Sequence, residues 1–363
     1  MPENNRGQTF ARRGLSSDPR SCNPVEYQLY CLLHITARRN WLIASTRRLN
    51  HSFPARSRGN MYRLDRILCP IDFSTASVEA VRFASFLARN ANGQLTLIHV
   101  DEHEKTPLGF FDRDESSVAH YREKVNSFVQ AKYAEIIKRE RLSPEPSALL
   151  VRFGTAYYEI IGVAEEDRYS LVVIATESLG GSSPHLIGRT AERVVRLCRT
   201  PVLTVRPRPQ PDGWKITTIL CPTDFSEYSN FAIPYAISVA RRYKAKIILL
   251  HVTDLAVQHP EALIQKFPDP RFYHDNADEI EFEKIVGRDV EPENTIVRLA
   301  EEYQVDLIVI GTHGARGMRR VQIGNVVEEV VRRTTVPVLT ITHPIHKAVF
   351  PRRFMEDYAE SSN

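Results

Sequence analysis

A repeat within the chain constrains its fold more than any other feature of the sequence. The octapeptide Ile-Leu-Cys-Pro-Ile-Asp-Phe-Ser at 67–74 returns as Ile-Leu-Cys-Pro-Thr-Asp-Phe-Ser at 219–226. Farther along, the apolar run at 171–176 returns at 307–312, and Pro-Val-Leu-Thr at 201–204 returns at 337–340. Two copies of about 145 residues indicate two domains of ordinary size rather than a solenoid of short repeats.

The repeat also sets the domain boundaries that we predict. Copy one covers 61–206 and copy two covers 215–343, followed by a tail at 344–363. Residues 207–214 between the copies contain three prolines, which predicts a stiff linker.

Residues 1–60 differ in composition from the rest of the chain. They hold ten of the 48 basic residues, all of them arginine, but only three of the 44 acidic residues, and they show no sustained helical or strand period. We interpret them as a disordered extension or as sequence upstream of a start at Met61, with a targeting peptide or a basic arm as alternatives. The remaining chain is mildly acidic, which argues against a nucleic-acid-binding protein.

From residue 61 onward, apolar strands alternate with helical periods. In copy one the pattern predicts strands at 67–71, 95–100, 149–153, 171–176 and 202–205, and helices at 75–89, 114–141, 157–167 and 189–199. This alternation is typical of an α/β domain, a doubly wound parallel sheet with helices on both faces. Copy two follows the same plan, except that Pro260, Pro268 and Pro270 leave room for only a short helix at 261–267 in its second crossover.

One loop in copy two has the composition of a phosphate-binding loop. The buried-type strand at 307–310 stops at Gly311, further glycines follow at Gly314 and Gly317, and Gly324-Asn325 opens an amphipathic helix. Glycines allow a close approach of backbone N–H groups, and a helix N-terminus adds partial positive charge. A glycine-rich turn without a ligand is the alternative interpretation.

The order of these motifs resembles the universal stress protein family over 61–342. The resemblance rests on Pro-Thr-Asp-Phe-Ser after the first strand, His-Val ending the second, and Gly-x-x-Gly, nine residues and Gly before the last helix. It implies two tandem five-stranded sheets of strand order 3-2-1-4-5. Ligands of such sheets bind where the order reverses, beyond the carboxyl ends of the first and fourth strands. Nucleotide-binding members hold ATP there, so the resemblance implies ATP, with or without Mg²⁺, as the ligand.

The resemblance also implies a set of site residues in copy two. The segment after the first strand would lie beside adenine and ribose, a valine backbone would face the base, and the glycine loop and helix entry would hold the phosphates: Pro222, Thr223, Asp224; Val252; Gly311, Thr312, His313, Gly314; Gly324, Asn325, Val326. The family has Ser or Thr where this chain has Asn325, which we expect still to cap the helix. Arg316, Arg319 and Arg320 are close enough in sequence to add positive charge.

Copy one is a poorer candidate for a nucleotide site. Ala175 and Ser178 replace the two loop glycines, and Glu177 stands where copy two has His313. A carboxylate beside phosphates repels them, an effect that Arg189 could partly offset. We expect copy one to be degenerate and to support the fold.

These features predict a cytoplasmic stress-response regulator or sensor that binds ATP through its second domain. The alternatives are an interaction module of the same fold that binds no nucleotide, and an enzyme of related fold. No phosphoryl-transfer or hydrolase motif and no metal-ligand pattern is present, so we predict no catalytic or metal-binding residues and at most weak ATP hydrolysis.

The last strand of each copy would lie at a sheet edge, where unpaired backbone groups invite pairing. We therefore predict an intramolecular pseudo-dimer, or a homodimer, formed through 201–205 and 337–341. Protein partners stay unknown from the sequence. No apolar stretch reaches the roughly 20 residues of a membrane helix, so we expect no membrane span.

Overall fold

The computed structural model describes residues 62–102, 115–142, 148–176, 187–207, 213–273, 277–314 and 324–344. The predictions for 1–60, the three arginines of the copy-two loop, and residues 177 and 178 lie outside these ranges. No helix in the described ranges is both long enough and apolar enough to cross a membrane.

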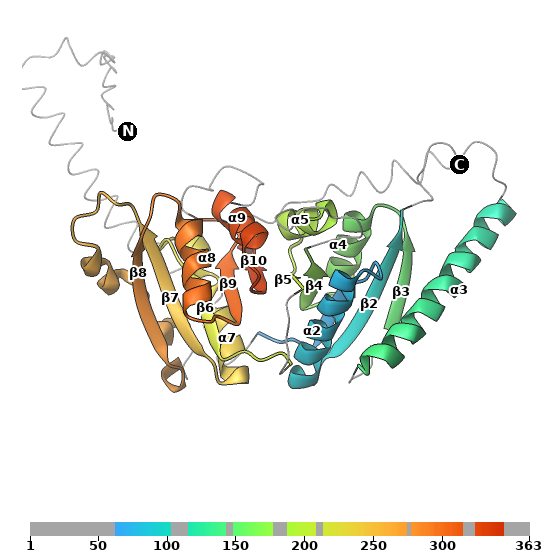
Figure 1. The fold of residues 1–363 in the computed structure, drawn as a ribbon, viewed down its shortest axis with the longest axis horizontal. Helices are drawn as coiled ribbons and strands as arrows, with labels where there is room; N and C mark the ends of the chain where they lie inside the picture. The colour runs from blue at the N-terminus through green and yellow to red at the C-terminus, as the bar shows by residue number, and fades with distance from the viewer. Residues whose placement is uncertain are drawn as a thin grey trace, which may run out of the picture. The chain divides into compact units, whose positions relative to one another are not determined.

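Strands and helices alternate in both copies (Figure 1). Copy one contains β1 (Arg66–Pro70), α2 (Thr75–Ala91), β2 (Gln94–Asp101), α3 (Glu115–Glu140), β3 (Ala148–Phe153), α4 (Ala156–Glu166), β4 (Leu171–Ala175), α5 (Arg189–Leu197) and β5 (Val202–Val205). Copy two contains β6 (Thr218–Pro222), α6 (Glu227–Asn230), α7 (Ile233–Tyr243), β7 (Lys246–Thr253), η2 (Pro260–Lys266), η3 (Pro270–Phe272), η4 (Ala277–Glu279), β8 (Phe282–Arg288), α8 (Pro292–Glu302), β9 (Leu307–Gly311), α9 (Asn325–Arg333) and β10 (Val338–Ile341).

The ten strands form one sheet of order β3-β2-β1-β4-β5-β10-β9-β6-β7-β8. Each half is parallel and has the predicted order 3-2-1-4-5, and every residue of β4 and β9 is buried, as expected for strands covered on both faces. The predicted pairing of the last strands is confirmed, because β5 runs antiparallel to β10 with Leu203 opposite Leu339. The two five-stranded halves are therefore one continuous sheet.

Alternate strand residues point to two separate cores, one on each face of the sheet. In β1, Ile67 and Cys69 belong to the core under α2 and α7, whereas Leu68 belongs to the core under α4, α5, α8 and α9. Both cores contain residues of both copies. Neither half can therefore lose its packing without exposing apolar surface of the other.

Aromatic side chains join the copies on the face of α2 and α7. Phe83 of α2 packs on Trp214 with ring centroids 4.3 Å apart, and Phe86 stacks on Tyr243 at 5.5 Å. Tyr62, which precedes β1, lies 4.7 Å from Tyr235 of α7. Trp214, the last residue of the proline-rich linker, is thus fixed against copy one.

The first helix of copy two is broken, unlike its counterpart α2. Pro234 lies in the first turn of α7, where its missing N–H removes the bond that would continue α6 into α7. The alignment of the repeat places Arg82 at this position in copy one, and α2 runs through it without a break. The hydrophobic pattern of copy two does not predict this break.

The second crossover of copy two is shortened, as the prolines predicted, but it is not an α-helix. Residues Pro260–Lys266 form a 3₁₀ turn, and Phe267 after it packs edge-to-face on Phe225, with ring centroids 5.2 Å apart. In copy one, Phe128 of α3 contacts Phe73 in the same manner at 6.5 Å. Phe267 is 5% exposed and Phe128 is 58% exposed, so the ring is buried in copy two and largely open to solvent in copy one.

Candidate functional site

The turn between β6 and α6 holds the carboxylate of Asp224 in a fixed orientation. Phe225 has a φ of 65°, in the left-handed region, which reverses the chain after Asp224. Asp224 Oδ1 accepts hydrogen bonds from Ser226 N (3.0 Å) and from the hydroxyl of Ser229 (2.6 Å). Two donors on one oxygen leave the carboxylate little freedom to rotate.

The side chain of Thr223 points toward α6. Its hydroxyl donates to Asn230 Oδ1 (2.6 Å) and accepts from Phe225 N (2.9 Å), and its carbonyl accepts from His251 Nδ1 (2.8 Å). The side chain is buried, so the predicted contact of Thr223 with a base or ribose has no support from its position.

Sequence reasoning missed Asn230. By the repeat, the Thr223 and Asn230 pair corresponds to Ile71 and Val78 in copy one. Both members of an apolar pair are thus replaced by hydrogen-bonding residues in copy two. A comparison of the two copies at this offset would have found the pair.

Two glycines of the copy-two loop are required by close approach. A Cβ on Gly311 would lie 2.8 Å from the carbonyl oxygen of Tyr228, and a Cβ on Gly314 would lie 2.4 Å from Asp224 Oδ2. The structure therefore brings Asp224, after β6, against Gly314, after β9. Since β6 and β9 are neighbours whose following helices lie on opposite faces, this is the point where the strand order reverses.

Thr312 and His313 are buried at the end of β9. Thr312 N donates to the carbonyl of Ile341, and its hydroxyl lies 2.9 Å from His313 Nδ1 and donates to Thr342 Oγ1 (3.3 Å). These bonds anchor the start of the loop to the end of β10. The Thr312 side chain serves this anchor, and the His313 side chain is buried beside it.

The end of the loop is closed onto its beginning by Gly324, whose N–H donates to the carbonyl of Thr312 (2.9 Å). Gly324 is also the N-cap of α9, so the expectation that Asn325 caps the helix is wrong: Asn325 is the first helical residue and is exposed. Val326 packs against the core, and the first turn of α9 begins directly beside Thr312. The helix N-terminus thus points to the loop, where an anion is favoured.

Val252 lies one strand away from Asp224. It is half-buried, packs on the face of α8 and is paired in register with Gly287 of β8. Its position near the carboxyl end of β7 is compatible with a backbone contact to a bound base.

Asn325 also lines a polar groove of about 630 Å³ between α8 and α9. The other lining residues are four carboxylates and two arginines, namely Glu291, Glu293, Glu328, Glu329, Arg332 and Arg333. Glu329 is paired with Arg332, and Arg333 donates to Asn294 Oδ1 (2.7 Å). Because carboxylates outnumber arginines, this groove does not suit a triphosphate.

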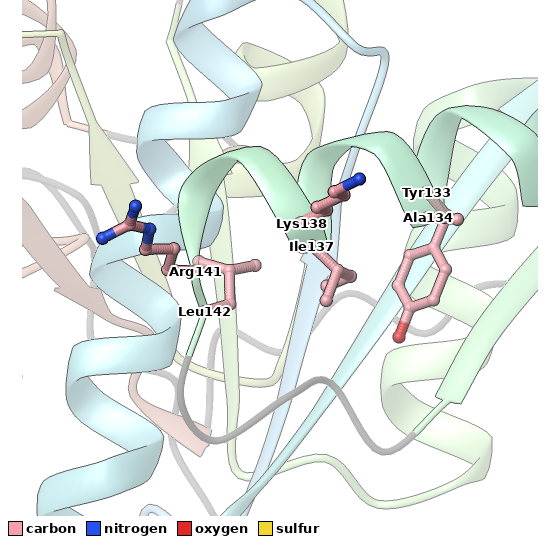
Figure 2. Close-up of a pocket in the computed structure, with 6 residues that line it drawn as sticks. All are labelled: Tyr133, Ala134, Ile137, Lys138, Arg141 and Leu142. Carbon is pink, nitrogen blue, oxygen red and sulfur yellow. The ribbon is translucent and has the colours of Figure 1, made fainter.

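A second cavity, of about 580 Å³, lies along the C-terminal half of α3 (Figure 2). Its lining residues are Tyr133, Ala134, Ile137, Lys138, Arg141 and Leu142. Helix α3 runs antiparallel to the strands, so this end lies at the amino ends of the strands. The cavity is therefore at the opposite edge of the sheet from the predicted site and contains none of its residues.

In copy one the counterpart of the site is built differently. Asp72 Oδ1 accepts from the backbone N–H and the hydroxyl of Ser74, and Ala175 fills the position of Gly311. Gly188 N donates to the carbonyl of Thr176 (2.7 Å), as Gly324 does to Thr312. Arg189 is exposed at the start of α5.

Three buried cysteines are poor nucleophiles. Burial raises the pKa of the Cys69 thiol well above its ordinary value and raises those of Cys198 and Cys221 to about 12. Within the described ranges, no group of three or more His, Cys, Asp and Glu side chains could hold a metal ion. These thiols serve as core-filling residues.

Comparison with known proteins gives a consistent result for both copies. The model of the universal stress protein family matches residues 63–206 and again residues 215–342. Universal stress protein G of Escherichia coli O157:H7 is 31% identical over 143 residues, which cover 39% of this chain and 97% of that protein. Universal stress protein MJ0531 of Methanocaldococcus jannaschii is 28% identical over 144 residues, covering 35% and 82%.

A solved structure shares the fold over most of the length. A universal stress protein from Archaeoglobus fulgidus DSM 4304 aligns with a TM-score of 0.57 at 20% identity, over 78% of this chain and 97% of that one. At this identity the likeness concerns the fold alone.

Proposed function

The chain belongs to the universal stress protein family, and on this premise we propose that it is a cytoplasmic stress-response regulator or sensor that binds ATP through its second domain. One observation carries the proposal. Asp224 and the loop after β9 meet where the strand order reverses, and Gly314 lies so close to Asp224 that an added Cβ would be 2.4 Å from its Oδ2.

Each part of a nucleotide has a suitable partner at this point. The Asp224 carboxylate would accept hydrogen bonds from ribose hydroxyls, and the backbone of Val252 would face the base. Gly314 has no side chain to exclude a phosphate, and the N-terminus of α9 would receive the negative charge. Magnesium would arrive coordinated by the phosphates, as is usual for this ion.

The proposal concerns copy two and not copy one. Ala175 stands at the position of Gly311, and by the repeat Glu177 stands at that of His313. A carboxylate next to a triphosphate is repulsive. Copy one would then support the shared sheet and both cores.

Calorimetric titration of MgATP into the full chain tests the proposal. We expect saturable binding near one equivalent, lost in Gly314→Val, because a valine side chain would occupy the space between the loop and Asp224. Ser178→Val, at the corresponding position of copy one, is the matched control and should bind as the parent does.

Absence of binding at millimolar ATP would refute the proposal. It would favour an interaction module of the same fold that binds no nucleotide. Asn325, where the family pattern has Ser or Thr, and the carboxylates around it are the observations that favour this second candidate.

A further inference from the structure

Ser229 contacts Asp224 at two points. The Ser229 hydroxyl donates to Asp224 Oδ1 at 2.6 Å. Ser229 Oγ also accepts a hydrogen bond from the backbone N–H of Asp224 at 3.2 Å. Ser229 is 7% exposed, so its hydroxyl is held inside the turn rather than in solvent. The carboxylate is therefore fixed by a buried side chain five residues along the chain.

The corresponding serine of copy one, Ser77, makes two bonds that Ser229 also makes, because Ser229 donates to the carbonyl of Ser226 (3.1 Å) and accepts from Asp224 N (3.2 Å). Ser77 donates to the carbonyl of Ser74 (3.0 Å) and accepts from Asp72 N (3.3 Å). Within the described residues, no hydrogen bond joins Ser77 to the carboxylate of Asp72. There the hydroxyl of Ser74, at 2.5 Å, binds the carboxylate of Asp72. The two copies have the same residues at these positions but use a different serine to hold the aspartate.

Copy two also has a polar network at this turn. Thr223 Oγ1 lies 3.1 Å from Ser229 Oγ and is itself bonded to Asn230, whereas copy one has Ile71 and Val78 at these positions. This network surrounds the Ser229 hydroxyl, which bonds to Asp224 Oδ1. The other carboxylate oxygen of Asp224, Oδ2, lies on the side of Gly314. A Cβ added to Gly314 would be 2.4 Å from this oxygen.

We propose that Ser229 is a positioning residue that orients the Asp224 carboxylate toward the ribose hydroxyls of a bound nucleotide and so sets the preference of the site for ribonucleotides. The inference rests on the proposed function. It assigns to copy two a sugar specificity that depends on a residue outside the predicted site.

The test compares the dissociation constants of ATP and 2′,3′-dideoxyATP, which lacks both hydroxyls, for the full chain. Hydrogen bonds from two hydroxyls to a charged group should make ATP the tighter ligand by about tenfold or more. In Ser229→Ala we expect this ratio to fall to about two or three, with the affinity for dideoxyATP unchanged. Ser77→Ala is the matched control and should keep the parent ratio.

In Ser229→Ala the hydroxyl of Ser226 could bond to Asp224, as the hydroxyl of Ser74 bonds to Asp72 in copy one. The double variant Ser226→Ala/Ser229→Ala is therefore measured as well, and Ser74→Ala/Ser77→Ala is its control. An unchanged ratio in both copy-two variants would overturn the inference. Equal losses of ATP and dideoxyATP affinity would also overturn it, because they would indicate a damaged site rather than lost sugar recognition.

Failure of the inference and failure of the proposed function give different results. A parent chain that binds ATP and dideoxyATP equally well contradicts the role of Ser229 but keeps nucleotide binding. A parent chain that binds neither refutes both.

Discussion

At the scale of single residues, a comparison of the two copies shows where a different neighbouring structure goes with a different residue. Gly311 lies against the backbone of α6, where an added Cβ would be 2.8 Å from the carbonyl oxygen of Tyr228. Ala175 occupies the same position in copy one, where α2 is unbroken and the alanine is simply buried. The glycine is thus explained by a neighbouring element and needs no ligand.

This contrast gives a prediction. Gly311→Ala should destabilise the protein by about 1–3 kcal/mol, because a backbone carbonyl 2.8 Å from the new Cβ must move. Ala175→Gly should cost less, about 1 kcal/mol or below. Thermal unfolding followed by circular dichroism compares them, and a larger loss for Ala175→Gly would contradict this account.

Some of the site residues could be predicted from the sequence and others could not. The apolar runs and glycines were enough to predict Asp224 and Gly314 as members of one site, because both follow neighbouring strands. The turn of Thr223 toward Asn230 could not be predicted, since it depends on hydrogen bonds made after the helix has broken. The N-cap of α9 was assigned to Asn325 from side-chain preference, whereas the loop closure makes Gly324 the cap.

At the scale of elements, hydrophobic period predicted every strand of copy one to within about two residues. It failed where tertiary packing decides the structure. The prolines of the second crossover excluded a long helix, but they could not show that Phe267 would pack on Phe225. Pro234 likewise is consistent with two structures, because a proline can occupy the first turn of a helix or break a longer one.

The shortened crossover carries an acid-sensitive contact. Hydrogen bonding from Arg271, through its side chain and its backbone, lowers the pKa of Asp269 to about 2. Because the folded pKa is below the unfolded value, this contact stabilises the fold above about pH 4. That contribution is lost as the pH falls from about 4 toward 2.

Asp269→Asn should therefore narrow the stability difference between neutral and acid pH. The pair is exposed, so the effect is small. Urea unfolding at pH 7 and at pH 3 measures it, and Arg271→Gln should reproduce it because the arginine is its main cause. Parallel pH profiles of the parent and both variants would contradict the assignment.

At the scale of the whole molecule, the described part of the chain unites two repeats through a sheet and two cores. Figure 1 shows β5 and β10 side by side at the centre of the sheet, where Leu203 faces Leu339 in an antiparallel pair. On the α2 and α7 face, Phe83 is fully buried and packs on Trp214 of the linker. The copies should therefore unfold together.

Phe83→Ala tests this coupling. Removal of a fully buried ring should cost about 3–5 kcal/mol and lower the melting temperature in a single transition. Phe128→Ala, at a ring that is 58% exposed, is the control and should change the stability by about 0.5 kcal/mol or less. Calorimetry that resolved two separate transitions, with only one shifted, would show that the halves are independent.

The antiparallel join of β5 and β10 also bears on how the two halves can diverge. In a symmetric homodimer every substitution occurs twice, once on each side of the axis, so a change that helps one subunit is imposed on the other. Here the two sides of the join are encoded separately. Copy one can therefore keep Ile71 and Val78 in its core while Thr223 pairs with Asn230 in copy two, and one half can specialise while its twin keeps the scaffold intact.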